Sequence, residues 1–297
     1  MVTAALPYAN GRLHIGHLVE YIQADMYVRA HRQAGRSVHF FCAADAHGTP
    51  IEINARKQGI SPDDLVAEAH ATFVQDFDRF GVEFDEFHTT HSPENRDLAT
   101  EIYEKLAAQG DIVREARDQY WCDHDQRFLP DRFVRGTCPK CDGADQYGDN
   151  CELCGATYAP TDLRSPACAL CGNPPTQRSS ERLFFDLPKY GERLATWMQD
   201  ALDPGVRRFV EGFVEGGLRI WDISRDGPYF GFEIPGETNK YFYVWLDAPV
   251  GYMATARHWA NQQGAADPDY FWRDDSIERL HVIGKDIVYF HSLFWPA

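Results

Sequence analysis

Two spaced cysteine pairs carry the strongest chemical signal in the sequence. Cys138-Pro-Lys-Cys141 is followed, after nine residues, by Cys151-Glu-Leu-Cys154. Four thiolates in two such pairs complete the tetrahedral shell of a structural zinc ion and leave no position for water. In a chain of this length the spacing favours metal ligation over a disulfide framework, and it predicts a reducing, cytoplasmic compartment.

A third pair, Cys168-Ala-Leu-Cys171, has no fourth pair after it, but Cys122 lies upstream in Cys122-Asp-His-Asp125. A second zinc ion bound by Cys122, Cys168, Cys171 and either His124 or Asp125 is therefore a hypothesis of its own. We favour His124, because imidazole is a common zinc ligand beside thiolates. A metal-free remnant of a knuckle is the alternative.

A second motif, His14-Ile-Gly-His17, follows an apolar run at residues 2–6 and a loop at residues 7–11. At the start of a helix, residues three apart lie on one face. Helix N-termini attract anions, and a glycine at position 16 lets a ligand approach the backbone. We expect the two imidazoles to donate hydrogen bonds to phosphate oxygens. A chance pair on a surface turn is the alternative.

The elements around this motif alternate between strand and helix patterns. A helix with Leu18, Ile22 and Met26 on one face is predicted to follow the motif and to end near Gly35. A buried strand is expected at residues 38–43. Further helices should begin after Ser61 and Ser92, each of which precedes a proline. Strands separated by such helices indicate an α/β fold with a parallel sheet.

The pattern changes after residue 110 and returns near residue 241. The intervening stretch is rich in Cys, Gly, Pro and Asp. We expect a strand at residues 241–246, a helix at 249–262, and a strand at 281–283 that leads into a helix at 284–286. The sequence therefore predicts one α/β domain, residues 1–110 and 232–297, split by a zinc-binding insertion at residues 111–231.

The amino-acid composition excludes some classes of binding partner. Acidic residues outnumber basic ones, 45 to 29, for a net charge of −16. Such a charge repels polyanions, so any nucleic-acid binding has to be local. No apolar run approaches the ~20 residues of a membrane helix, and no basic-then-apolar leader is present. We expect a globular protein with no membrane partner.

The histidine motif, with Pro7-Tyr-Ala-Asn-Gly11 before it, resembles the first signature of the class I aminoacyl-tRNA synthetases, in their methionyl branch. Further blocks in that family's order lie at residues 42–51, 128–132, 221–225, 243–249 and 283–291. The resemblance implies a Rossmann-like catalytic domain split by a connective insertion near the tRNA acceptor end. It also implies a methionine–tRNA ligase that uses L-methionine, ATP with Mg²⁺, and tRNA(Met).

The family's second signature, a lysine-containing loop, does not occur in the sequence, and neither does the helical anticodon-binding domain. The resemblance therefore implies an N-terminal catalytic part of a longer synthetase, impaired when it acts alone.

Residue roles follow from the same resemblance. His14 and His17 would be catalytic, and ATP would contact them together with Asn10, Gly16, Gly284 and Asp286. The methionine pocket would comprise Leu6, Tyr8, Asp45, Trp245, Ala248, Pro249, Tyr252, Ile287 and His291. Asp45 would hold the substrate ammonium. Tyr8 and His291 would add polar contacts to the sulfur, in which case Tyr8→Phe should narrow the preference for methionine over apolar analogues.

Other classes of function explain less. A class I synthetase for leucine, isoleucine, valine or cysteine would share the first signature but not the blocks at residues 44–50 and 244–249. A zinc-ribbon binding protein would leave the histidine motif unexplained, and a nucleotidyltransferase would not explain the insertion. A basic cluster in the insertion is either a tRNA contact or a solvated face; it comprises Arg127, Arg132, Arg135 and Lys140.

Overall fold

A four-stranded parallel sheet forms the centre of the computed structural model, which describes residues 1–148 and 150–297. Its strands are β1 (Val2–Ala4), β2 (Phe40–Ala44), β3 (Glu86–Thr89) and β13 (Leu280–Val282), in the order β3-β2-β1-β13. Strand β13 pairs with β1 in parallel after the whole insertion has intervened. The predicted α/β fold with a parallel sheet is confirmed.

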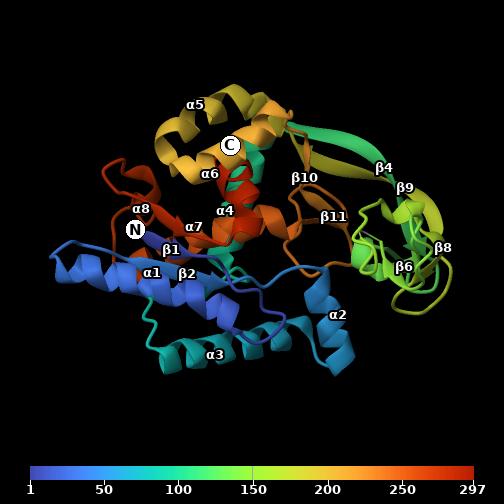
Figure 1. Cartoon of the computed structure of the whole chain (residues 1–297), viewed down its shortest axis with the longest axis horizontal. Helices are drawn as coiled ribbons and strands as arrows, with labels where there is room; N and C mark the ends of the chain where they lie inside the picture. Colours follow the sequence, from blue (N-terminus) through green and yellow to red (C-terminus); the bar gives the residue numbers. More distant parts are fainter. Residues whose placement is uncertain (149) are drawn as a thin grey trace.

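Helices cover both faces of this sheet (Figure 1). They are α1 (Ile15–Gln33), α2 (Thr49–Gln58), α3 (Pro62–Phe80), α4 (Pro93–Ala108) and α7 (Val244–Gln262). Helices α4 and α7 pack against each other, and α7 also packs against β2 and β3. The predicted helix starts are confirmed, because the side chains of Ser61 and Ser92 accept hydrogen bonds from the first turns of α3 and α4.

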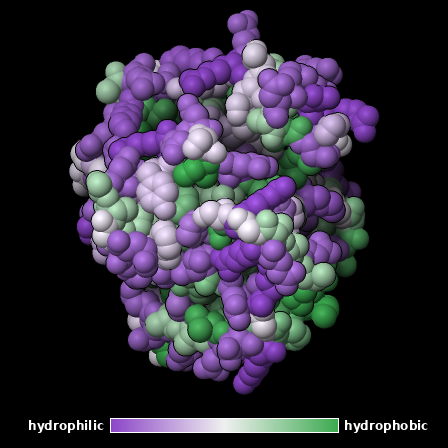
Figure 2. Space-filling model, turned by 90° about the vertical axis from the view of Figure 1, so that its left-hand side faces the viewer, coloured by the Kyte–Doolittle hydropathy of each residue, from purple (hydrophilic) through white to green (hydrophobic). Residues whose placement is uncertain are grey.

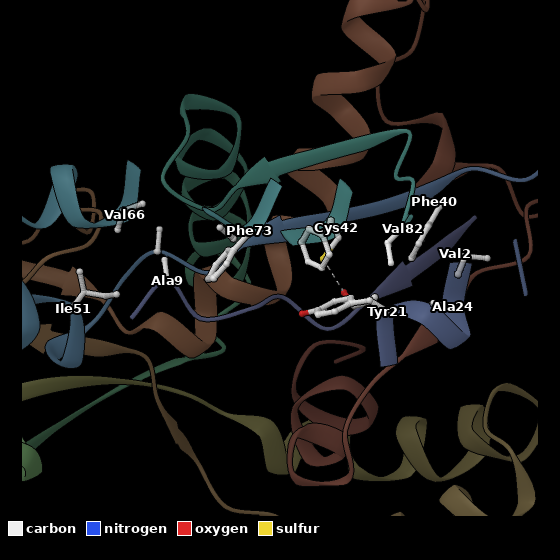
Figure 3. Packing of buried hydrophobic residues seen from close by; sticks show 14 of the residues in the cluster. Val2, Ala9, Tyr21, Ala24, Phe40, Cys42, Ile51, Val66, Phe73 and Val82 are labelled. Carbon is white, nitrogen blue, oxygen red and sulfur yellow. Dashed lines mark hydrogen bonds between the residues drawn. The ribbon is translucent and has the colours of Figure 1, made fainter. Parts of the chain in front are cut away.

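The main core lies between the sheet and helices α1 and α3, where Tyr21, Phe40 and Phe73 are fully buried (Figure 3). Every residue of β2 is buried, as expected for a strand covered on both faces. The Cys42 thiol donates to the carbonyl of Ala4 at 3.5 Å and so links β2 to β1.

The insertion is built from antiparallel strands. Two long strands, β4 (Ile112–Cys122) and β9 (Thr176–Phe185), pair along their length and extend away from the parallel sheet (Figure 1). They carry a small sheet in the order β7-β6-β8. The remaining strands and helices are β5 (Arg127–Phe128), β6 (Val134–Thr137), β7 (Gln146–Tyr147), β8 (Arg164–Cys168), α5 (Gly191–Ala201), α6 (Pro204–Glu215), β10 (Trp221–Asp222), β11 (Ser224–Asp226), β12 (Lys240–Phe242) and α8 (Tyr270–Arg273).

Several predicted boundaries were wrong. Of the expected strand at 241–246, only residues 241 and 242 lie in a strand, β12 (Lys240–Phe242), and α7 already begins at Val244. The aromatic and β-branched run there imitates a strand, but packing against β2 and β3 places it in a helix. The expected helix at residue 284 is a 3₁₀ turn, Lys285–Ile287, followed by a π-helical turn.

Helix α1 also buries a different face from the predicted one. Leu18 is buried, but Met26 is 64% exposed, and Tyr21, Ala24 and Val28 take the core positions.

Figure 2 shows that the face beside α1 is mostly hydrophilic, with apolar side chains in small separate groups. Within the described part of the chain, no helix is both long enough and apolar enough to cross a membrane.

Candidate functional site

A cavity of about 620 Å³ opens at the carboxyl ends of the parallel strands. Ligands of open α/β sheets bind at this edge. The cavity wall comes from the loop after β1, the loop after β2, the first half of α7 and the segment after β13. The structure brings together all the side chains expected around methionine: Leu6, Tyr8, Asp45, Trp245, Ala248, Pro249, Tyr252, Ile287 and His291.

Asp45 is the acidic group best placed to receive a cation. It follows β2, and its backbone bonds to the loop after β1: its N–H donates to Pro7 at 2.9 Å, and its carbonyl accepts from Ala9 at 2.7 Å. Its Oδ1 atom is buried without a hydrogen-bond partner among the described residues. Burial, and then the charge of Asp247, raise the pKa of Asp45 well above its usual range. An ammonium group would satisfy this oxygen.

A buried chain of polar side chains leads from Asp247 toward the surface. Nδ1 of His47 contacts the Asp247 carboxylate, and both side chains are buried. Nε2 of His47 lies 2.9 Å from Nδ1 of His91, and Nε2 of His91 lies 3.1 Å from Asp63, which is exposed. Sequence reasoning missed this network; its only signal was a carboxylate and an imidazole within otherwise apolar stretches.

The hydroxyl of Tyr8 and the imidazole of His291 are already engaged with the protein. Tyr8 donates to the carbonyl of His47 at 2.9 Å. Nδ1 of His291 lies 2.9 Å from the Ile287 carbonyl and therefore carries the ring proton, so Nε2 accepts from the Tyr252 hydroxyl at 2.9 Å. In this structure the protein itself engages both protons, and a contact of either group with the sulfur stays a prediction.

Aromatic packing leaves the side-chain end of the cavity apolar. Trp245 stacks on Phe290 with ring centroids 3.7 Å apart, and Trp295 lies 5.3 Å from Tyr252. Gly48 has φ +109°, and a Cβ there would lie 3.2 Å from the Tyr8 hydroxyl, so only glycine permits the close approach of these loops.

The two histidines of the first motif lie together at the start of α1. Their rings stack with centroids 3.7 Å apart, and the His14 backbone N–H donates to Nδ1 of His17 at 3.3 Å. A Cβ on Gly16 would lie 3.0 Å from the His14 ring, so glycine makes room for this stack. Burial, and then the neighbouring His14, lower the pKa of His17.

The residues expected around ATP do not all line this cavity. His17, Gly284 and Asp286 line the cavity, whereas His14 is exposed at the N-cap of α1. Asn10 lies in a neighbouring cavity, and its carbonyl accepts from Asn54 at 3.1 Å.

Some cavity residues were not assigned from sequence. Glu20 accepts from the Ala5 backbone at 2.7 Å. The guanidinium of Arg225 lies 3.6 Å from the centroid of the Tyr243 ring, and Tyr229 completes the wall nearby. Arg225 stands in a block that carried the resemblance, but its spacing to the other motifs gave no sign of where it points.

The first cysteine group has the geometry of a zinc shell. The Sγ atoms of Cys138 and Cys154 are 3.9 Å apart, and those of Cys141 and Cys151 are 3.6 Å apart. Four sulfurs about 2.3 Å from a central zinc ion lie about 3.8 Å from one another, so the four thiols fit the metal. All four also belong to one group of atoms within 4.8 Å of each other.

The second group selects Asp125 in place of His124. Oδ2 of Asp125 lies 3.3 Å from the sulfur of Cys122 and 3.2 Å from that of Cys168, while Cys171 lies 3.4 Å from Cys122. The His124 side chain is 64% exposed, and its Nδ1 atom lies 3.3 Å from Oδ1 of Asp125. The turn directs Asp125 inward, because its N–H donates to the Cys122 sulfur at 3.3 Å. In this geometry Asp125, the alternative to His124, lies with the three cysteines.

A second cavity, of about 850 Å³, adjoins the first and shares Tyr8, Pro50 and Arg132 with it. The guanidinium groups of Arg132 and Arg135 lie 4.8 and 3.9 Å from the centroid of the Tyr147 ring. Helix α2 adds two basic residues, Arg56 and Lys57.

The predicted basic cluster needs one correction. Arg127 is 9% exposed, and it pairs with Glu52 at 3.0 Å and lies over the Phe133 ring. It is therefore buried between the insertion and helix α2, whereas Arg132 and Arg135 line the second cavity.

Comparisons with known proteins point to one family. The model of the family "tRNA synthetases class I (M)" matches residues 1–297. The chain is 56% identical over 305 residues to a methionine–tRNA ligase of Myxococcus xanthus (strain DK1622), covering 100% of this chain and 43% of that relative.

Solved structures give the same result. Two structures of Mycobacterium tuberculosis methionyl-tRNA synthetase with methionyl-adenylate superimpose with TM-scores of 0.72 and 0.70 at 25% identity, covering 99% of this chain and 53% of each. The chain spans about half the length of the relatives it matches. Because the family match covers every residue, the chain belongs to the class I tRNA synthetases of the methionyl group.

Proposed function

We propose that this chain carries the methionine-activating site of a methionine–tRNA ligase. The substrates would be L-methionine and ATP with Mg²⁺, the intermediate methionyl-adenylate, and the acceptor the 3′ end of tRNA(Met). The observation that carries the proposal is a single cavity that joins an unpartnered Asp45 oxygen to an aromatic wall at the carboxyl edge of the sheet. The identity to a methionine–tRNA ligase supports the substrate.

Methionine would enter with its ammonium group at Asp45 and its side chain against Trp245, Pro249 and Tyr252. The thioether is polarizable and packs well against the edges of aromatic rings. With the protons of Tyr8 and His291 held by the protein, the site would select mainly by shape, and one methylene changes binding by only about 1–3 kcal/mol. Rejection of smaller apolar amino acids would therefore depend on how completely the side chain fills the cavity.

ATP would lie across the start of α1, with its phosphates near His14 and His17 and its ribose near Gly284 and Asp286. In the first step a carboxylate oxygen of methionine bonds to the α-phosphorus, and the bond from that phosphorus to the oxygen bridging the α- and β-phosphates breaks to release pyrophosphate. Imidazole N–H groups and the helix N-terminus would stabilise the charge on the phosphate oxygens. The protein contributes alignment of the two reactants.

The insertion, residues 111–231, would be the connective module of the family. Cys138, Cys141, Cys151 and Cys154 would hold a structural zinc ion. Cys122, Asp125, Cys168 and Cys171 would hold a second one, in a shell that is also closed. When bound, these ions crosslink the turns of the module and take no part in the chemistry.

The second cavity is the proposed entry for the tRNA acceptor end. Tyr147 with Arg132 and Arg135 offers a ring for stacking a base and cations for phosphates, a combination that binds single-stranded nucleic acid. The shared wall at Tyr8 and Arg132 would deliver the terminal ribose to the adenylate. Local basic groups are needed there, because the chain as a whole is acidic.

Titration with L-methionine while tryptophan fluorescence is recorded tests the proposal. Trp245 lines the cavity and Trp295 lies beside Tyr252, so occupancy should change the emission. We expect a saturable change with methionine and none with leucine, isoleucine or cysteine. Exchange of pyrophosphate into ATP, dependent on methionine, tests the chemical step. An equal response to leucine, or no response to any amino acid, would overturn the assignment.

A further inference from the structure

A third set of side chains that could bind a metal lies away from the cavity and from both cysteine groups. Atoms of Glu86, His88 and His258 that can bind a metal all lie within 4.8 Å of one another. Glu86 and His88 belong to the edge strand β3, and His258 lies in the second half of α7. At a rise of 1.5 Å per residue, His258 lies about 20 Å along the helix from Trp245, so the cluster is separate from the amino-acid pocket.

The fold brings these residues together by strand alternation and helix packing. Residues two apart on a strand project to the same face, so Glu86 and His88 point together while Phe87 joins the phenylalanines of α3 on the other face. Helix α7 packs over β3 on the first of these faces, and α4 packs beside α7. The three residues therefore meet from two elements that are far apart in sequence.

The two imidazoles are already oriented side by side. The rings of His88 and His258 stack with centroids 4.2 Å apart and planes inclined by 13°. Glu94, in the first turn of α4, reaches both: one oxygen lies 2.9 Å from Nδ1 of His258, and the other lies 3.5 Å from Nε2 of His88. Gln262 holds the remaining nitrogen of His258 at 2.8 Å. A carboxylate that orients ligating histidines is typical of metal centres.

One nitrogen in this cluster has an ion-pair contact but no hydrogen bond. Nε2 of His88 is buried, and its contact with the Glu94 carboxylate at 3.5 Å does not have hydrogen-bond geometry. Neutral imidazole is the form that binds a metal. Native structures rarely leave a buried polar atom unpaired, so this nitrogen calls for an explanation.

We propose that Glu86, His88 and His258 form a binding site for a divalent transition-metal ion, with Zn²⁺ as the ion it takes, and that Glu94 positions the two imidazoles. Two imidazoles with one carboxylate form a ligand set typical of zinc. A set with two nitrogen donors favours such an ion over Mg²⁺ or Ca²⁺, which prefer oxygen ligands alone. Access is open, because the side chains of His88, Glu94 and His258 are 14%, 23% and 29% exposed.

The ion would connect three elements at the edge of the sheet. It would join β3 to the second half of α7, and through Glu94 to α4, while the first half of α7 lines the cavity. An ion lies in the plane of each imidazole that binds it, and the two rings are stacked in near-parallel planes, so one ring has to turn when the ion binds. Binding also displaces one contact of His258, and the three-ligand site keeps a position open for water. Its affinity should therefore lie below that of the four-cysteine group. A ligand that binds only the folded chain raises the unfolding temperature.

Calorimetric titration with Zn²⁺ tests the proposal on chain that has been loaded with zinc and then dialysed, so that the tight cysteine sites are filled. We expect one further equivalent to bind, with a rise in unfolding temperature of a few degrees at saturating zinc. His258→Gln and the isosteric Glu86→Gln should each weaken this equivalent by at least about tenfold. His31→Gln, which removes a histidine of α1 outside the cluster, is the matched control and should bind like the unchanged chain.

Two results would overturn the proposal. One is the absence of a further saturable equivalent in the unchanged chain. The other is an equivalent that binds equally well in the His258→Gln and Glu86→Gln variants, because it would then belong to Cys122, Asp125, Cys168 and Cys171. The fluorescence response to methionine serves as the check of folding for each variant, since the cluster lies outside the cavity. If His258→Gln fails this check, Glu86→Gln decides the outcome.

Discussion

The cavity on the parallel sheet and the cysteine-bearing sheet of the insertion hold their polar groups in different ways. In the cavity, Tyr8 and His291 are fixed by hydrogen bonds to the protein itself, and a large buried core lies behind them. In the insertion, the sulfurs lie next to one another, and the buried cluster around Phe133 and Val134 is small. A core of that size rarely stabilises a fold without a crosslink. We therefore expect the insertion to need metal for its order, and the cavity not to need it.

The largest expected effect comes from removing a ligand of the four-cysteine group. Cys151→Ser should lose the tightly bound zinc ion and unfold the small sheet, because zinc contributes about 10–16 kcal/mol in small zinc domains. The methionine response of Trp245 should persist. Zinc content and limited proteolysis, with fragments identified by mass, measure both parts of the molecule.

Glu152→Gln is the matched control, since Glu152 is an exposed residue between Cys151 and Cys154 that belongs to neither ligand set. It should keep its zinc and resist cleavage. If the insertion of the Cys151→Ser chain remains resistant to protease, its small core is sufficient to order it without metal. The proposed difference between the insertion and the cavity would then be wrong.

In the cavity, the charge at Asp45 should have the next largest effect. Asp45→Asn keeps the shape but removes the partner of the substrate ammonium, and we expect methionine to bind about 100-fold more weakly. Fluorescence titration measures the change. Asp78→Asn, an exposed carboxylate on α3, is the control and should leave the dissociation constant unaltered. Equal binding by both variants would place the ammonium elsewhere in the cavity.

The second metal group allows a finer test within the insertion. Asp125→Asn should lower the zinc affinity of this group by about 100-fold, whereas His124→Gln, which changes a residue outside the ligand set, should cost about tenfold or less. Competition with a chelator measures both. A larger loss in His124→Gln would restore the imidazole as the fourth ligand and would mean that the turn rearranges around the metal.

These residues also show what sequence can reveal. The cysteine pairs and the histidine motif were recognisable because their members are close in sequence and their spacing reflects local geometry. The choice between His124 and Asp125 could not be recognised from the sequence, because the two residues are adjacent. Which of them points inward depends on the turn, in which the Asp125 N–H donates a hydrogen bond to the Cys122 sulfur.

Other features could not be predicted because they depend on contacts between residues far apart in the sequence. Asp247 and His47 are 200 residues apart, so no spacing pattern could pair them. The segment at residues 244–246 has the composition of a strand, and only its packing over the sheet makes it helical. The helices that begin after Ser61 and Ser92 and the strand near residues 38–43, by contrast, were evident from capping residues and apolar patterning, whereas β3 and α2 were not predicted.

The pH dependence of methionine binding tests how far the cavity is fixed by its own charges. Burial and Asp247 both raise the pKa of Asp45, so Asp45 takes up a proton, and loses the ammonium, at a higher pH than an ordinary carboxyl group. Methionine affinity should therefore fall on acidification. Asp247→Asn removes one of the two causes and should move the midpoint of this fall to lower pH. A midpoint that stays in place, or moves upward, would mean that Asp247 does not raise the pKa of Asp45.

The smallest effect on methionine binding is expected for Tyr8→Phe. Its effect on the ratio of affinities for methionine and for an apolar analogue distinguishes selection by shape from recognition of the sulfur. The hydroxyl donates to His47 and lies against Gly48, so its removal should loosen the loop after β2. One lost hydrogen bond of about 0.5–1.5 kcal/mol corresponds to about 2–12-fold weaker binding of any amino acid that fits. The ratio of affinities for methionine and for an apolar analogue of equal length should stay constant.

A falling ratio would have a different cause. It would mean that the Tyr8 hydroxyl leaves the His47 carbonyl and turns to the sulfur when methionine is bound. The cavity would then resemble the cysteine groups in one respect: its polar contacts would be completed by the ligand. Leu6→Ala supplies the reference for that measurement, because it changes the volume of the same wall without touching a hydrogen bond, and it should alter the ratio through shape alone. Only a change that Tyr8→Phe produces beyond this reference can be assigned to sulfur recognition.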